Sequence, residues 1–110
     1  MARVAVIATL DTKGGEAEFL RSCLEELGHE ALILDTGLLG PPRIAPDISR
    51  HEILKLAGVE DLEVLRPSGK TALMDAMTRG LRVMVVKLQS EGKIQGVLSL
   101  GGGQGTAVLA

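Results

Sequence analysis

The sequence has almost no aromatic residues and almost no cysteine. Phe19 is the only aromatic residue among 110, which argues against a nucleic-acid surface built from stacked rings. Cys23 is the only cysteine, so an internal disulfide and a multi-cysteine metal site are both excluded. The formal net charge of −2 gives no electrostatic reason to expect nucleic acid or an anionic membrane as a partner.

Long apolar runs are missing as well. No stretch reaches the roughly 20 uncharged apolar residues of a membrane-spanning helix. The apolar start of the chain lacks the cleavage pattern of a signal peptide. We therefore expect a cytoplasmic protein without membrane contact, and a length of 110 residues allows one domain with one modest core.

The chain does contain an alternation of apolar runs and amphipathic segments. Residues 4–8 and 31–34 are continuous apolar runs, which are typical of strands covered on both faces. Between them we predict a helix from Glu16 that stops at Gly28. Its apolar stripe consists of Leu20, Cys23, Leu24 and Leu27. A strand, a helix and a strand within this length predict a right-handed parallel crossover.

The second half of the chain continues the alternation. Residues 37–48 form a proline-stiffened loop, and a loop of this length usually has a functional or interfacial role. A capping box at residues 49–52 begins a short helix, a longer helix covers residues 70–91, and residues 94–100 form a third strand. We predict an α/β fold with a Rossmann-like, three-layer parallel sheet, in the order β-α-β-α-α-β plus the start of another helix.

The glycine-rich run GGGQGT at residues 101–106 follows the third strand. Glycine amides at a helix start can surround an anion, and Gln104 and Thr106 can add side-chain hydrogen bonds. The alternative is a tight turn that needs no ligand. Because two glycines would suffice for such a turn, the run favours phosphate or another oxyanion.

Two other strand ends meet the same edge of a parallel sheet, where ligands bind. After the first strand, Lys13 can reach an anion, while Asp11 and Thr12 can hydrogen-bond a ribose or hold a metal-bound water. Nearby glutamates repel phosphate, so we expect the phosphates to lie on residues 101–106. Asp35 ends the second strand at the distance in sequence from the first glycine loop at which dinucleotide-binding folds place a ribose-binding acid. The first loop, however, lacks the pattern G-x-G-x-x-G, which disfavours a nicotinamide cofactor.

Other motifs contribute less. The sequence SGKT at residues 68–71 lacks the earlier glycine of a P-loop and predicts only a turn and a helix start. No general base is paired with a nucleophile. Spacing alone therefore predicts a nucleotide-sized ligand that carries an oxyanion, without a catalytic constellation.

Three motifs taken together, ATLDTKGGEAEFL, ILDTGLLGPPRIAPDISRHEI and GVLSLGGGQGT, resemble the N-terminal ATP-binding domain of the tomato-mosaic-virus resistance protein family. The resemblance covers essentially the whole chain and implies ATP, alone or with magnesium, at the strand ends. By motif it assigns nucleotide contacts to Asp11, Thr12, Lys13, Thr36, Arg66, Gly101, Gly102, Gly103, Gln104 and Gly105.

Members of that family continue well beyond 110 residues and add a barrel-like C-terminal domain. The resemblance therefore implies that residues 1–110 are one nucleotide-binding subdomain, a truncated half-domain of a longer protein. The family's self-association and an unpaired sheet edge together predict a homodimer. The alternatives are the phosphate-gripping part of an enzyme whose catalytic groups lie in the barrel, an NAD(P)-binding fold, or a fragment whose glycine loop is empty.

Overall fold

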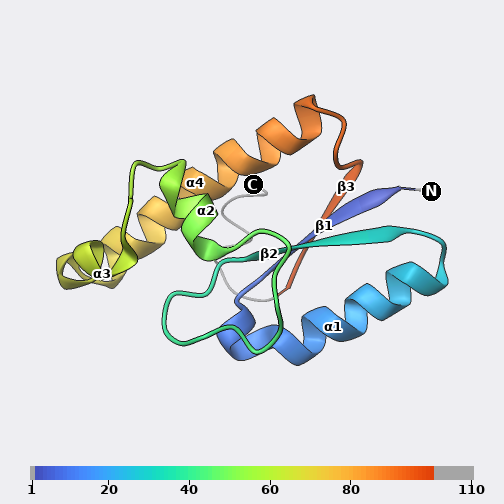
Figure 1. The fold of residues 1–110 in the computed structure, drawn as a ribbon, viewed down its shortest axis with the longest axis horizontal. Coiled ribbons are helices and arrows are strands. Elements are labelled where there is room, and N and C mark those ends of the chain that lie inside the picture. The colour runs from blue at the N-terminus through green and yellow to red at the C-terminus, as the bar shows by residue number, and fades with distance from the viewer. Residues whose placement is uncertain (1, 101–110) are drawn as a thin grey trace.

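The computed structural model describes residues 2–100. It has a three-stranded parallel sheet and helices on both faces (Figure 1). In chain order the elements are β1 Arg3–Ala8, α1 Leu10–Glu26, β2 Glu30–Asp35, α2 Arg50–Lys55, α3 Leu62–Leu65, the 3-10 helix η1 Arg66–Ser68, α4 Lys70–Ser90 and β3 Gly96–Ser99. The predicted α/β, Rossmann-like half-domain is confirmed.

β1 is the central strand, and the strand order is β2-β1-β3. Val6 lies opposite Ile33 on one side and Leu98 on the other, and both pairings are parallel. Its continuous apolar sequence follows from its position, because both faces of β1 are covered. Ala5 and Ile7 belong to one core cluster, whereas Val6 and Ala8 belong to another.

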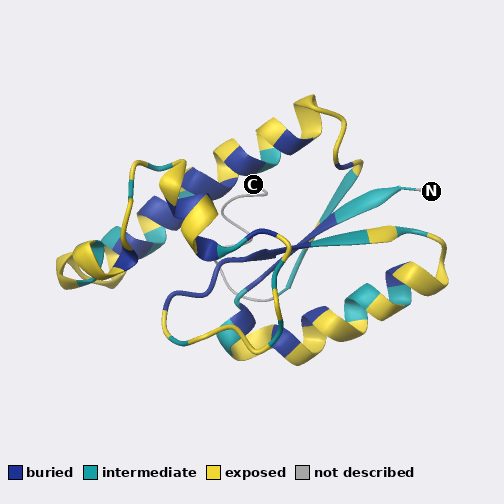
Figure 2. Cartoon of the chain, viewed as in Figure 1, coloured by how far each residue is buried: buried dark blue, intermediate teal, exposed yellow. Residues whose placement is uncertain are grey.

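The two clusters make the molecule three layers thick. α1 covers one face of the sheet through Leu10, Ala17 and Leu24, while α2 and α4 cover the other (Figures 1 and 2). The apolar stripe of α4 is buried as its spacing predicts, and its members are Leu73, Met77, Leu81, Met84 and Leu88.

Helix α4 also shows why one glycine is needed. A Cβ added to Gly80 would lie 2.2 Å from the backbone oxygen of Ile53 in α2. The absence of a side chain at Gly80 thus lets the two helices approach each other closely. The predicted capping box of α2 is present, since Ser49 and Glu52 exchange hydrogen bonds at its first turn.

The start of α1 differs from the prediction. We predicted a loop at residues 11–15 and a helix from Glu16, but α1 already begins at Leu10 and is kinked at Lys13, whose φ and ψ are −116° and 21°. A carboxylate from a different strand causes the difference, because Asp35 accepts a hydrogen bond from the N–H of Leu10 and caps the helix.

The end of α1 differs too. Leu27 was placed on the buried stripe, but α1 ends at Glu26 and Leu27 is 72% exposed. Cys23, predicted to be a core residue, is only half-buried. Gly28 has φ +82° and reverses the chain, as its place after the helix predicts.

Candidate functional site at the carboxyl edge of the sheet

The carboxyl ends of the strands bring distant segments together. Ala8 pairs with Asp35 at the end of β1 and β2, and the N–H of Thr36 donates to the carbonyl of Ala8 at 2.9 Å. On the other side of β1, the N–H of Leu100 donates to the carbonyl of Ile7 at 2.9 Å. The end of β1 therefore lies between Thr36, which follows β2, and Leu100, which follows β3.

The predicted glycine run follows Leu100 directly in the sequence. Gly101, Gly102, Gly103, Gln104, Gly105 and Thr106 lie outside the described residues. The described residues include the other six predicted site residues and two arginines at this edge that the sequence did not indicate, Arg43 and Arg50.

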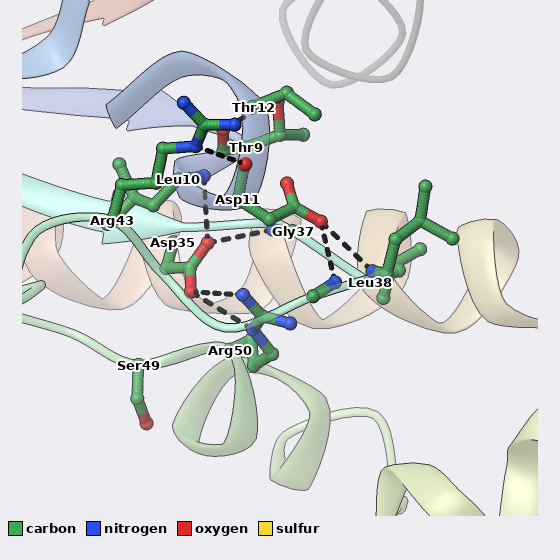
Figure 3. A network of polar contacts seen from close by, with 12 residues as sticks. Thr9, Leu10, Asp11, Thr12, Asp35, Gly37, Leu38, Arg43, Ser49 and Arg50 are labelled. Atoms are coloured by element: carbon green, nitrogen blue, oxygen red, sulfur yellow. Dashed lines mark hydrogen bonds and ion pairs between the residues drawn. The ribbon is translucent and has the colours of Figure 1, made fainter. Parts of the chain in front are cut away.

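Asp35 is almost completely buried, at 1% exposure, and is surrounded by donors (Figure 3). Its Oδ1 accepts hydrogen bonds from the N–H groups of Leu10 at 3.2 Å and Gly37 at 2.8 Å. Its Oδ2 accepts one from Nε of Arg50 at 3.0 Å. The carboxylate thus joins the start of α1, the loop after β2 and the start of α2, and its acceptor positions are already used by the protein.

Arg50 is a site residue that the sequence did not indicate. It is 6% exposed, and its Nη2 lies 3.0 Å from Oδ2 of Asp35 in an ion pair without a hydrogen bond. The capping box placed Arg50 on the first turn of α2, but nothing in the sequence shows that this turn packs against the end of β2. A charged residue in an apolar surrounding needs such a partner, so the pair is mutually dependent.

Asp11 fastens the loop of residues 37–48 to α1. Its Oδ2 accepts hydrogen bonds from the N–H groups of Leu39 at 3.0 Å and Gly40 at 3.1 Å. Its Oδ1 lies close to Gly37, where an added Cβ would be 2.8 Å from that oxygen. The carboxylate of Asp11 therefore shapes the rim of the site, and one of its oxygens is committed to the loop.

Arg66 fastens the same loop from the other side. Its Nη1 donates to the carbonyl of Leu38 at 3.0 Å, while Nε and Nη2 donate to the carboxylate of Glu63. The hydrogen bond with Glu63 raises the pKa of Arg66 above its ordinary value, and Glu63 balances its charge. Arg66 therefore lies against the loop at the rim of the site with its charge paired, and its predicted contact with a nucleotide stays a prediction.

The remaining predicted residues differ in accessibility. Thr36 is buried at 3% exposure, directly after β2. Thr12 is exposed and its hydroxyl lies 2.8 Å from that of Thr9. Lys13 is exposed and pairs with Glu16 across 3.5 Å, so its ammonium group is held weakly.

Arg43 is the second arginine that the sequence did not indicate. Its backbone N–H donates to the carbonyl of Leu10 at 2.9 Å, and its Nε donates to the carbonyl of Asp11 at 2.9 Å. These carbonyls belong to the turn of α1 that is kinked at Lys13. Figure 3 shows the guanidinium group at the same corner as Thr9 and Thr12.

This edge carries polar and charged groups of the kinds that contact ligands. It offers two hydroxyl groups and two exposed cations on a scaffold fixed by two carboxylates. Within residues 2–100, no three His, Cys, Asp or Glu side chains converge in a way that could hold a metal ion. Over the same residues, no helix is long and apolar enough to cross a membrane.

The fold and this edge define a class: an α/β domain with a parallel sheet and a candidate ligand site at the carboxyl ends of its strands. Residues 2–110 match the N-terminal domain of the uncharacterised protein family UPF0261, and the chain belongs to that family.

Individual relatives agree with this assignment. The chain is 30% identical to a UPF0261 protein of Clostridium tetani over 96% of its length, which is 26% of that relative. It is 31% identical to one of Brucella suis over 94% of its length, and 30% identical to one of Rhizobium meliloti over 99%. The chain spans about a quarter of the length of these curated relatives.

Proposed function

We propose that this domain binds ATP at the carboxyl edge of the sheet, with the phosphates on residues 101–106 and the side chains of Thr12 and Lys13 beside them. The observation that carries the proposal is the strand order. The chain goes from β1 to β2 on one side and to β3 on the other, so a topological switch point lies between β1 and β3. Ligands of open parallel sheets bind at such points, beyond the carboxyl ends of the strands.

The sequence at the switch point supports a nucleotide. The segments that leave the two strands there are DTKGG and GGGQGT. Glycine amides and an exposed lysine are typical partners of phosphate groups. The same segments carry the resemblance to the ATP-binding domain of the tomato-mosaic-virus resistance proteins, and this finer relationship is part of the proposal.

The geometry gives the predicted acids a supporting role in this proposal. Asp35 holds Arg50 and two backbone amides, so it is not available to bind a ribose. This argues for ATP over NAD, because NAD-binding folds use a free acid at this position to bind the ribose. Asp11 and Arg66 act by holding the loop of residues 37–48 at the rim.

The domain is proposed to serve a longer cytoplasmic protein that forms homodimers. Because the chain spans about a quarter of its relatives, a second candidate is the phosphate-gripping part of an enzyme whose catalytic groups lie elsewhere. Release of ADP from ATP by a full-length relative, absent from the domain alone, would favour this candidate.

Thermal unfolding with added ligands tests the proposal. ATP at 100 times its dissociation constant adds about 2.7 kcal/mol to stability. We expect ATP to raise the midpoint temperature of unfolding, while NAD does not. In Gly102→Val we expect ATP to leave the midpoint temperature unchanged although the protein stays folded, because a branched side chain would fill the phosphate space. Equal shifts with ATP and inorganic phosphate would reduce the proposal to an oxyanion site, and an unchanged midpoint with ATP would refute it.

A further inference from the structure

One arginine at the carboxyl edge has no acidic partner. Arg3, Arg21, Arg50, Arg66 and Arg79 each form an ion pair with a carboxylate. Arg43 instead donates to backbone carbonyls. Among the described residues, no carboxylate lies within 4.0 Å of its guanidinium group, so its positive charge is not balanced by a direct partner.

This uncompensated charge is nevertheless fixed in place. The backbone N–H and the side-chain Nε of Arg43 bond to the carbonyls of two consecutive residues, Leu10 and Asp11. Those carbonyls are in the kinked first turn of α1, next to the switch point. An exposed arginine usually loses side-chain entropy when it binds a ligand; the bond at Nε removes part of that cost in advance.

A glycine makes this attachment possible. A Cβ added to Gly14 would lie 2.7 Å from Cβ of Arg43 and 3.5 Å from its Cα. Real carbon atoms do not approach so closely, so any other residue at position 14 would displace Arg43 from α1. Gly14, which follows the kink of α1 at Lys13, therefore favours the observed position of Arg43.

The groups around Arg43 suit an anion. The bond at Nε leaves both Nη groups for a further acceptor, and within residues 2–100 they have no hydrogen-bond partner. The hydroxyl groups of Thr9 and Thr12 lie at the same corner (Figure 3). A guanidinium group whose two Nη groups are free binds a phosphate through paired hydrogen bonds along that edge, which a lysine cannot do.

We infer that Arg43 binds the terminal phosphate of a nucleoside polyphosphate and makes the site selective for triphosphates. The inference rests on the proposed function, which supplies the nucleotide whose terminal phosphate Arg43 binds. The carboxylate of Asp11 is turned toward the amides of Leu39 and Gly40, so it does not neutralise this cation directly.

Binding of ATP, ADP, AMP and inorganic tripolyphosphate by isothermal titration calorimetry tests the inference. We expect Arg43→Ala to lower the affinity for ATP and tripolyphosphate at least 10-fold. The affinity for ADP should fall less, and the affinity for AMP less than twofold. Arg43→Lys should recover only part of the loss, since the paired geometry is absent. The matched control is Arg79→Ala, which also removes an exposed arginine bonded to a main-chain carbonyl but lies on α4.

A second variant keeps the arginine and moves it. Gly14→Ala should reproduce the loss of ATP affinity while circular dichroism remains that of a folded protein. If the wild type binds ATP and Arg43→Ala binds it within twofold of the wild type, the inference is overturned and the proposed function stands. If the wild type binds tripolyphosphate but not ATP, the nucleotide proposal fails and the inference about nucleoside polyphosphates fails with it. Absence of binding of both ligands overturns both.

Discussion

Three parts of the chain meet at the carboxylate of Asp35: the N–H of Leu10, the N–H of Gly37 and the guanidinium group of Arg50. The sequence identified Asp35 by its interval from the first loop, which is the interval of a ribose-binding acid. The same interval also suits an acid that caps a neighbouring helix, and spacing cannot distinguish these roles. The choice between them depends on Arg50, which is 15 residues away in sequence.

Loss of the Asp35 charge should strongly destabilise the protein. Asp35→Asn leaves Arg50 buried without a counter-charge, and breaking a buried pair in this way costs about 3 kcal/mol or more. Urea unfolding measures the loss. Asp75→Asn is the matched control, because it breaks an exposed pair with Arg79 and should cost less than about 1 kcal/mol. Equal losses in the two variants would contradict the structural role of Asp35.

The loop of residues 37–48 has a comparable test at Asp11. Asp11→Ala removes the acceptor of two backbone N–H groups, at Leu39 and Gly40. We expect amide hydrogen exchange at these two residues to become faster, while exchange in β1 changes little. Unchanged protection at both amides would show that Asp11 does not hold the loop.

At the scale of elements, apolar periodicity predicted the bounds of those helices and strands whose ends are set by their own buried residues. The strands and α4 were predicted nearly to their observed ends, because their apolar residues face the two core clusters. The start of α1 could not be predicted, since its first N–H is capped by a side chain of β2. The role of Arg43 could not be predicted for a similar reason, since its partners are main-chain carbonyl groups, which every residue has.

The contact of α2 with α4 gives a prediction at this scale. Gly80→Ala places a Cβ 2.2 Å from the carbonyl of Ile53, so the two helices must separate. Overpacking of this kind costs about 1–3 kcal/mol. In Gly15→Ala nothing lies within 4 Å of the new Cβ, so this variant in α1 should be neutral or more stable by about 0.5–1 kcal/mol. Chemical denaturation of both variants provides the comparison, and a stable Gly80→Ala protein would contradict the close approach.

The N-terminus of α2 gives a smaller effect. Ser49→Ala removes the hydroxyl that accepts the N–H of Glu52 and should cost about 1 kcal/mol in thermal or urea unfolding. Ser49→Asp, which can still cap the helix, should retain most of the stability of the wild type. If Ser49→Asp is as unstable as Ser49→Ala, the capping box does not stabilise α2.

At the scale of the whole molecule, the two edges of the sheet are unequal. The outer edge of β2 is covered, because Ile48 exchanges backbone hydrogen bonds with Ile33 and Asp35. β3 is the other edge strand, and its Leu98 is 40% exposed. Among residues 2–100 no strand pairs with the outer side of β3, and an edge strand of this kind is a template for pairing with another chain, which is the physical basis of the proposed homodimer.

Self-association through β3 is measurable by light scattering during size-exclusion chromatography. We expect the wild type to form dimers that dissociate on dilution, and we expect Leu98→Lys to shift the equilibrium toward monomers, because charge on an edge strand opposes pairing. Val64→Lys, at an exposed apolar residue of α3, should have no such effect. A wild type that stays monomeric at all concentrations would refute the proposed homodimer.

The central claim is that a nucleotide binds where β1 and β3 end. A titration of the isotopically labelled protein with ATP, followed by the chemical shifts of its backbone amides, tests it most directly. We predict that the chemical-shift changes concentrate at residues 9–13, 99 and 100 and in the glycine run. Shifts at the opposite edge, around Ala2 and Gln95, or no shifts at millimolar ATP, would contradict it.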